Sequence, residues 1–313
     1  MRKNLTKKLF LSVLTLAFAV ISLGASTYAW FTLSKDATVD TFQGKVTAGT
    51  SGLEIQITNF DVTTPVESAW SVTSIPASVI NGFLDPEFKF AAVQFDQSNY
   101  TFKTQAQALE AATGNATFNK DYIAFNVHFR LSDAAATDAD VNLYLKELGF
   151  TTTNVSATPW NAAKSYTDGN GSTIAQGPLA APYYVQDAAR VAFDTSSTYD
   201  HVYEATSGSD HYTSAKAGHT NLGAVDYYNK VNEQEAQIEQ DGAMVDNPKY
   251  IKVPAGYYKP EQKPAENVQL GVLPNDGSSI YVTVYVWVEG WDAECINNIF
   301  SQILSIDMSF TIE

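Results

Sequence analysis

The stretch Ile280–Glu289, IYVTVYVWVE, decides the fold class of this chain. Every even-numbered position in it is aliphatic, and the odd-numbered positions carry Tyr, Thr, Tyr, Trp and Glu. A period of two places the two sets on opposite faces of an extended strand. The C-terminal run has the same pattern, with an apolar side chain at every second position: Leu304, Ile306, Met308, Phe310 and Ile312. We expect this last strand to have one face in the core and one in water, and its lack of Pro and Gly favours a central position in its sheet.

Four more segments extend the pattern toward the N-terminus. Tyr122–Leu131, Val141–Leu145 and Leu53–Thr58 alternate apolar and polar side chains, and Thr38–Val46 is a further candidate strand. The chain has almost none of the strand–helix alternation that a parallel α/β fold requires. The sequence therefore predicts an all-β protein built as an antiparallel β-sandwich.

Helical signals are few and short. Gln105–Ala112 (QAQALEAA) has high helix propensity and ends before a glycine. Asp292–Ile303 begins with a capping residue and connects the two strongest strands. Asn229–Gln240 is polar and is interpreted as a short exposed helix. We expect one or two short helices beside the strands.

Residues 151–269 differ in composition from the rest of the chain. They are rich in Ser, Thr, Gly, Asn, Asp and Tyr, and their periodicity is weak. Prolines interrupt them repeatedly: Pro159, Pro178, Pro182, Pro248, Pro254, Pro260 and Pro264. A loop of that length is unusual inside one domain. We interpret the region as a large irregular insertion between core strands, with a separate subdomain as the alternative.

The first 29 residues have the three parts of a secretory signal peptide. A basic start is followed by the apolar run Leu9–Leu23 and then by small residues. Thr27 and Ala29 suit the −3 and −1 positions, so we place cleavage between Ala29 and Trp30. The apolar run is shorter than the ~20 residues that a spanning helix needs, and a retained anchor is the alternative. Residues 30–313 are then the secreted β-sandwich domain, and the protein contacts the membrane only through an uncleaved leader.

The charge of the chain limits its partners. The net charge is −15, and the leader holds four of the 19 basic residues and none of the 34 acidic ones, so cleavage leaves a charge near −19. Such a charge argues against nucleic acid and anionic lipid as partners, because both need basic residues. A hydrophobic fraction of 45% is sufficient for a packed core.

No recognised metal-binding motif is present. The histidines lack the spacing of zinc ligands: His128, His201, His211 and His219. Asp168–Ser172 resembles the opening of a calcium loop, but Thr173 and Leu179 stand where that loop needs Gly and an acid, and a glycine-rich turn explains it better. Asp133–Asp140 is interpreted as a solvated hairpin loop. We expect no cofactor, and calcium stays open as an alternative.

Nothing in the sequence indicates catalysis. The single cysteine, Cys295, excludes an intrachain disulfide, and its apolar neighbours favour a buried thiol. The chain lacks a GxSxG elbow and a phosphate loop, and no spacing selects a carboxylate pair for glycoside hydrolysis. We therefore expect a non-enzymatic protein. The insertion supplies aromatic candidates for ligand binding, with core packing as the alternative: Trp160, Tyr183, Tyr184, Tyr257 and Tyr258.

The residues around the cleavage site resemble those of a known family. Thr27-Tyr28-Ala29-Trp30-Phe31-Thr32 is followed by Ala37-Thr38-Val39 and by a TAG…LEI segment from Thr47 to Ile55. This order is similar to the N-terminus of TasA/camelysin-type secreted proteins of Gram-positive bacteria, which use a SipW-type signal peptidase. The segment Trp287–Cys295 before the final strand also resembles an ending of such surface proteins. About fifty residues carry the resemblance closely, and the middle of the chain does not.

The resemblance implies a jelly-roll-type β-sandwich that assembles into extracellular or biofilm-matrix fibres. It implies as partners other copies of the chain, other matrix or surface proteins, and a SipW-type signal peptidase during export. Some camelysin relatives are classed as metalloproteases, but this chain offers no metal motif, so that activity is not carried over.

Cleavage before Trp30 suggests a physical route to assembly. It frees a new N-terminus, Trp30-Phe31-Thr32-Leu33, which is apolar and suited to an extended conformation. Such a segment can add as a strand to the open sheet edge of a neighbour, with Trp30, Phe31 and Leu33 as anchors. Packing of these residues on their own subunit is the alternative. The runner-up function is a secreted β-sandwich that binds carbohydrate or a host ligand through the insertion.

Overall fold

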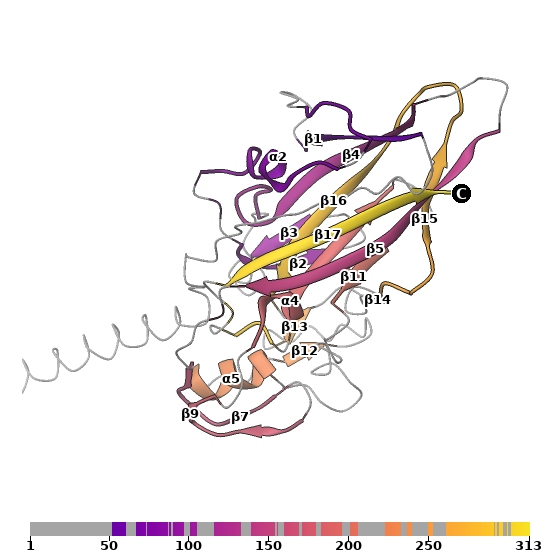
Figure 1. Cartoon of the computed structure of the whole chain (residues 1–313). Helices are drawn as coiled ribbons and strands as arrows, with labels where there is room; N and C mark the ends of the chain where they lie inside the picture. Colours follow the sequence, from indigo (N-terminus) through magenta and orange to yellow (C-terminus); the bar gives the residue numbers. More distant parts are fainter. Residues whose placement is uncertain are drawn as a thin grey trace, which may run out of the picture.

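The computed structural model describes residues 52–60, 67–96 except 73, 87 and 89, 101–104, 116–132, 139–153, 155, 160–168, 171–179, 183–195, 201–205, 223–232, 237–239, 250–252, 261–290, 292, 294–296, 299 and 302–313. Within these residues the protein consists mainly of strands in antiparallel sheets, with a few short helices (Figure 1). The prediction of an all-β protein is confirmed at this level.

The larger sheet follows from the segments with period two. Its main path is β1 (Leu53–Asn59), β4 (Ile123–Leu131), β16 (Ile280–Glu289), β10 (Ala189–Asp194), β11 (His201–Glu204) and β14 (Glu261–Gln262). β2 (Ala92–Asp96) pairs in parallel with the end of β16 and antiparallel with β3 (Thr101–Thr104). The predicted strands at 53–58, 122–131 and 280–289 are therefore confirmed, and they lie next to one another.

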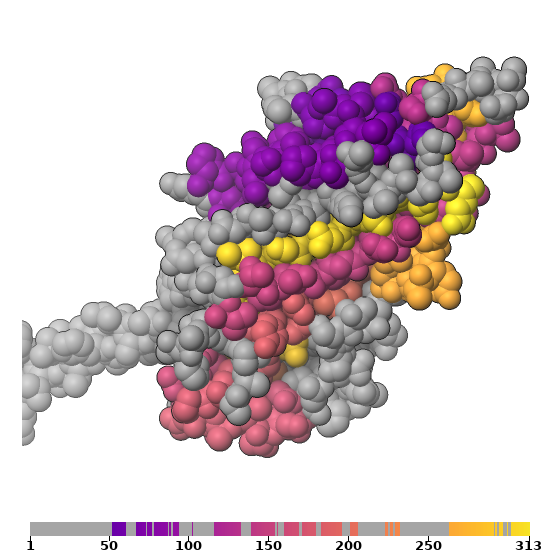
Figure 2. Space-filling model, in the orientation of Figure 1, coloured from indigo at the N-terminus to yellow at the C-terminus, as the bar shows by residue number. Residues whose placement is uncertain are grey.

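The smaller sheet has the order β15 (Val268–Leu273), β5 (Val141–Thr153) and β17 (Ile303–Ile312). β17 and β5 run side by side across one face of the molecule, in yellow and magenta in Figure 2. We expected the last strand to be central, but in the described part of the chain β5 takes that place. β5 holds it because β15 pairs with its first half.

The two sheets share one hydrophobic core. The aliphatic face of β16 meets the apolar face of β17 there, and Phe129 of β4 lies 4.9 Å from Phe310, ring to ring. Asp307 is exposed on the other face of β17, as the alternation predicts. Ser309 and Thr311 on that face are buried, so the polar face of this strand is only partly in water.

A second hydrophobic cluster covers the outer face of the larger sheet. Tyr285 and Trp287, from the odd-numbered face of β16, lie in it together with Phe102 and Tyr122. Both faces of β16 are therefore buried from Val282 to Glu289. Burial on both faces explains why the side chains on its second face are aromatic as well as polar.

Residues 151–269 supply both the cover of this cluster and strands of the larger sheet. The short hairpins β6 (Asn161–Ala162) with β9 (Gly177–Pro178) and β7 (Tyr166–Thr167) with β8 (Thr173–Ile174) gather at one end of the molecule with α5 (Gly223–Asn232) (Figure 1). A further pair joins β12 (Gln237–Glu239) to β13 (Tyr250–Lys252). β10, β11 and β14 also come from this region, which the sequence analysis set apart as an insertion.

The structure corrects two of the expected helices. The helix expected at Asn229–Gln240 is α5, which begins at Gly223 and ends at Asn232, and it is not exposed, because Ala224 and Tyr227 pack into the second cluster. Residues 237–239 form β12 instead. The helix expected at Gln105–Ala112 and the strand at Thr38–Val46 lie outside the described residues.

In its described residues the segment expected as a helix at Asp292–Ile303 forms tight turns, with a 3₁₀ position at Ile299, and Ile303 begins β17. The N–H groups of Cys295, Ile299 and Gln302 each donate to the carbonyl three residues before. Asp292 accepts the N–H of Glu294 at 2.8 Å, which closes a tight turn in place of a helix cap. The other helices within the described residues are α2 (Ala77–Asn81) and α4 (Val185–Ala188).

Candidate functional site

The sequence-predicted assembly and cleavage residues cannot be placed. Ala29, Trp30, Phe31 and Leu33 lie outside the described residues, as do the ligand-binding candidates Tyr257 and Tyr258. The roles predicted for them stay predictions.

The other aromatic candidates of the insertion pack against the second cluster or lie beside it. The Trp160 ring lies 5.0 Å from the Tyr227 ring, and the Tyr183 hydroxyl lies 2.7 Å from the hydroxyl of the fully buried Tyr166. Burial raises the pKa of Tyr183, and so does the charge of Asp168. Tyr184 is 39% exposed. The insertion thus uses most of its placed aromatic residues for packing.

The candidate metal ligands have ordinary structural contacts. The Asp168 carboxylate accepts the N–H of Ser172 at 2.7 Å inside the turn of the β7–β8 hairpin, as expected of a glycine-containing turn. His128 Nε2 lies 3.2 Å from the Thr58 hydroxyl, and Asp140 accepts the N–H of Asn275. No three His, Cys, Asp or Glu residues of the described segments are placed to hold a metal ion.

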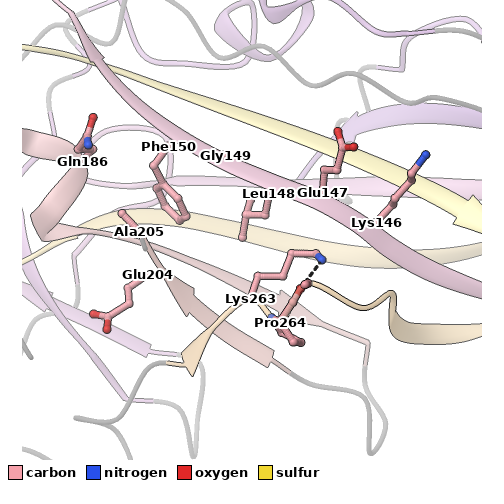
Figure 3. Close-up of a pocket in the computed structure, with 11 residues that line it drawn as sticks. Lys146, Glu147, Leu148, Gly149, Phe150, Gln186, Glu204, Ala205, Lys263 and Pro264 are labelled. Atoms are coloured by element: carbon pink, nitrogen blue, oxygen red, sulfur yellow. Dashed lines mark hydrogen bonds between the residues drawn. The ribbon is translucent and has the colours of Figure 1, made fainter. Parts of the chain in front are cut away.

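A cleft of about 430 Å³ opens beside the second half of β5 (Figure 3). One wall is the strand from Lys146 to Phe150. The opposite wall consists of Glu204 and Ala205 at the end of β11 and of residues 263–265 after β14. Leu148 and Phe150 point to the side on which Lys263 and Pro264 lie (Figure 3). The cleft therefore combines an apolar lining with a sheet edge.

The edge of β5 at this cleft has no strand partner in the described part of the chain. β15 pairs with β5 only over Val141–Leu145. Thr152 shows which way the edge faces, because its N–H donates to the side chain of Gln186, another residue of the cleft, at 2.8 Å. Main-chain groups point to alternate sides along a strand, so Leu148 and Phe150 direct their N–H and C=O groups the same way. Gln186 thus takes up the main-chain hydrogen bonding of this edge only at Thr152.

The charges of the cleft are mixed. Lys263 Nζ donates to the carbonyl oxygens of Pro264 and Glu266, at 2.9 and 3.2 Å. Burial lowers the pKa of Lys263, and the charges of Glu147 and Glu266 oppose this shift. Cationic and anionic side chains line the cleft together, so its charge does not select an ion. Its chemistry suits an extended segment with apolar side chains and free main-chain groups.

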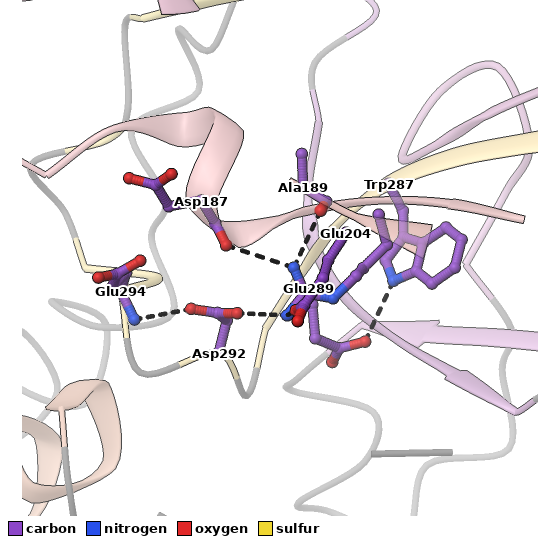
Figure 4. A network of polar contacts seen from close by, with 8 residues as sticks. Asp187, Ala189, Glu204, Trp287, Glu289, Asp292 and Glu294 are labelled. Carbon is purple, nitrogen blue, oxygen red and sulfur yellow. Dashed lines mark hydrogen bonds and ion pairs between the residues drawn. The ribbon is translucent and has the colours of Figure 1, made fainter. Parts of the chain in front are cut away.

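A buried ion network lies next to the cleft and shares Glu204 with it (Figure 4). Its centre is Arg190 of β10, which is 1% exposed. Arg190 Nη2 lies 2.5 Å from Asp292 Oδ2 and 3.1 Å from Glu204 Oε2. Its Nη1 donates to the carbonyl oxygens of Asp187 and Ala189. These bonds at Nη1 and Nη2 offset part of the cost of burying the arginine.

Residues of β16 and the following turn complete the network. The Trp287 indole donates to Glu289 Oε2 at 3.1 Å, and both residues are fully buried. Cys295 is also buried, as predicted, and burial and the carboxylates of Asp292 and Glu289 raise the pKa of its thiol. The protonated thiol is a poor nucleophile. The network fixes the turn after β16 onto the sheet.

The cleft was missed by sequence reasoning for a physical reason. The register of β5 with β17 passes from Glu147 opposite Ser309 to Leu145 opposite Phe310, so Lys146 is an extra residue in a β-bulge. The bulge moves the apolar side chains from odd positions, Leu143 and Leu145, to even ones. A search for period two that allowed one inserted residue finds Leu148 and Phe150.

Comparison with known proteins gives no match: no protein-family model, no curated protein and no solved structure resembles this chain closely enough to carry an argument. None of the helices in the described part of the chain is long and apolar enough to cross a membrane. The function is therefore argued from the chain's own residues.

Proposed function

We propose that this chain is a secreted, non-enzymatic structural protein that assembles into fibres at the bacterial cell surface or in the extracellular matrix. Its fold is then a jelly-roll-type β-sandwich, as the N-terminal resemblance to TasA/camelysin-type proteins implies. The observation that carries the proposal is the edge of β5 between Lys146 and Phe150, which faces a cleft of about 430 Å³. A sheet edge of this kind is a template for pairing with another chain.

The N-terminal segment freed by cleavage matches this edge in length and pattern. Five residues of β5 span ~17 Å, and Trp30–Ser34 as a strand spans the same length. Phe31 and Leu33 are two residues apart, so they fall on one face of that strand. On the edge of β5 this face adjoins Leu148 and Phe150, whose side chains are partly buried against the main core.

The surroundings of the edge limit pairing to a short window. Gln186 bonds to Thr152 at one end, and β15 covers the strand up to Leu145 at the other. Lys146 and Glu147 are exposed at the bulge, and charged residues and bulges both discourage unrestricted edge pairing. Such a window admits one short segment in one register and does not promote general aggregation.

Deletion of Trp30–Ser34 from the mature protein tests the assembly. We expect electron microscopy to show fibres for the mature protein and isolated subunits for the deletion variant. Fibres of unchanged length from the deletion variant would contradict the proposal. A Tyr281→Ala variant, changed at an exposed residue away from the cleft, is the matched control and keeps its fibres.

Cysteine pairing locates the acceptor edge. Leu33→Cys in one chain and Leu148→Cys in a second chain are expected to form a disulfide on mixing, because the proposed pairing brings the two positions together. The buried Cys295 stays reduced and does not compete. Val72→Cys replaces Leu148→Cys as the control at an exposed distant site. A disulfide found only when both substitutions are in one chain would show that the segment packs on its own subunit, and would overturn the proposal.

A further inference from the structure

A different surface of the larger sheet combines an exposed tyrosine with half-buried aromatic and polar side chains. The strand register places Gln56, His128 and Tyr281 in one row across β1, β4 and β16, all on the outer face of the sheet. Glu54 and Arg130 form the next row. We call these five residues and Trp70 the aromatic platform.

One aromatic ring of the platform is exposed, and those of Trp70 and His128 are half-buried. Tyr281 is 53% exposed, and its ring centre lies 5.5 Å from that of His128. The Arg130 guanidinium lies 4.1 Å from the centre of the Trp70 ring. Arg130 and Tyr281 are diagonal neighbours on adjacent strands, about 7–8 Å apart. Trp70 contacts Arg130, and Arg130 is a diagonal neighbour of Tyr281, so two aromatic side chains lie on either side of one guanidinium group.

The polar groups of the platform are held in place by bonds to the protein. Arg130 Nε lies 2.6 Å from Glu54 Oε2. Gln56 Nε2 donates to the carbonyl oxygen of Ser68 at 2.9 Å, and His128 Nε2 bonds to the Thr58 hydroxyl. Side chains fixed in advance lose little conformational entropy on binding. The platform is therefore prepared for a ligand and does not need to order itself.

The charge of the platform is balanced. Arg130 is paired with Glu54, and burial lowers the pKa of His128, with the charge of Glu67 opposing that shift, which favours the neutral form of the ring. The whole chain has a net charge of −15. Anionic polymers and nucleic acid are therefore repelled from this surface, since no excess of basic residues attracts them.

We propose that the aromatic platform binds a neutral polysaccharide chain. The C–H faces of the sugar rings pack on Tyr281 and Trp70, and the hydroxyl groups bond to Glu54, Gln56 and Arg130. Side chains aligned in rows across three strands suit an extended glycan, and amphipathic tyrosine and tryptophan rings suit a ligand that has both apolar and polar surfaces. This function goes beyond self-assembly and uses none of the residues of the β5 cleft.

Binding of neutral glycans to the mature protein tests the inference. The probes are insoluble cellulose, insoluble chitin and a soluble neutral β-glucan, with polygalacturonate as an anionic comparison. We expect the mature protein to bind at least one neutral probe, and Tyr281→Ala to weaken that binding about tenfold. Val272→Ala, which changes an exposed apolar residue elsewhere, leaves the binding unchanged.

Three results would overturn the inference. They are no binding to any neutral probe, binding only to polygalacturonate, and binding that Tyr281→Ala leaves intact. Circular dichroism confirms that Tyr281→Ala is folded, as expected for an exposed residue. Retention of glycan binding by the Trp30–Ser34 deletion variant separates this function from assembly, so either proposal can fail without the other. If Tyr281→Ala instead disrupts capture of a protein partner and no glycan binds, the platform is a protein-docking surface.

Discussion

Tyr281 and Trp287 lie on the same face of the same strand, yet one is 53% exposed and the other is fully buried. The difference is in what lies over them. Trp287 is covered by Phe102 of β3, whose ring centre lies 5.4 Å away, and by Ile296 of the following turn. Tyr281 contacts its cross-strand neighbour His128, and about half of its surface remains exposed. Segments distant in sequence thus divide the outer face of one sheet into a covered half and an open half.

Two arginine–glutamate pairs repeat this contrast. Arg190 with Glu204 and Arg130 with Glu54 are both cross-strand pairs on the outer face of the larger sheet. The Arg190 side chain is 1% exposed, and that of Arg130 is 37% exposed. The same kind of ion pair is therefore part of the buried packing in the covered half and part of the surface in the open half.

The largest expected effect comes from Trp287→Ala. The substitution leaves a cavity in the second cluster and removes the indole donor from the buried Glu289, so we expect a loss of about 3–5 kcal/mol in the free energy of unfolding. Urea denaturation measures it. Tyr281→Ala is the control and changes the free energy by at most about 0.5 kcal/mol. Equal losses for the two variants would remove the distinction between the covered and open halves.

Removal of the buried arginine comes next. Arg190→Met leaves the buried carboxylate of Asp292 without its cationic partner, and we expect a loss of about 3–5 kcal/mol. Arg130→Met breaks an exposed pair and costs about 0–1 kcal/mol. The same denaturation measurement compares them. If Arg190→Met is as mild as Arg130→Met, the buried network does not stabilise the turn after β16.

The smallest effect is a dependence of stability on alkaline pH. Burial, with the charge of Asp121, raises the pKa of Tyr122 to about 12, against about 10 in an unfolded chain. The folded state holds this proton more tightly, so its contribution is complete below pH 10 and is lost as the pH rises toward 12. Burial also raises the pKa values of Tyr285 and Tyr166.

Tyr122→Phe separates this contribution from the others. Thermal unfolding between pH 8 and pH 12 should show a weaker decline for the variant than for the unchanged protein. The phenylalanine ring keeps the stacking on Phe102, whose ring centre lies 3.9 Å from that of Tyr122. Identical declines for the two proteins would show that Tyr122 titrates as a solvated residue.

Much of the core was readable from the sequence, because alternation is a local property. Val282, Val284, Val286 and Val288 had to share a face, and so did Ile55 with Ile57 and Phe125 with Val127. β10 was not read as a core strand because ARVAFD is short and has a buried arginine in its second position. A charged residue in a core strand is explained only when Asp292 and Glu204 are brought beside it.

The candidate sites depended on tertiary structure to different degrees. The platform residues other than Trp70 belong to strands that the sequence predicts, but their rows exist only once β1, β4 and β16 are paired in register. The β5 cleft depended more strongly on tertiary structure. A bulge at Lys146 breaks the period of two, and the opposite wall comes from residues 204–205 and 263–265. Gln186 marks the edge solely through a contact with Thr152.

The sequence by itself determined that this protein is built from strands and which side chains lie on each face, since side chains alternate along an extended backbone whatever surrounds it. Only the tertiary structure decided which of those faces are covered. The odd-numbered face of Ile280–Glu289 carries a buried Trp287 at one end and an exposed Tyr281 at the other. Burial depends on the approach of segments that are distant in sequence, and a local alternation pattern contains no information about those contacts.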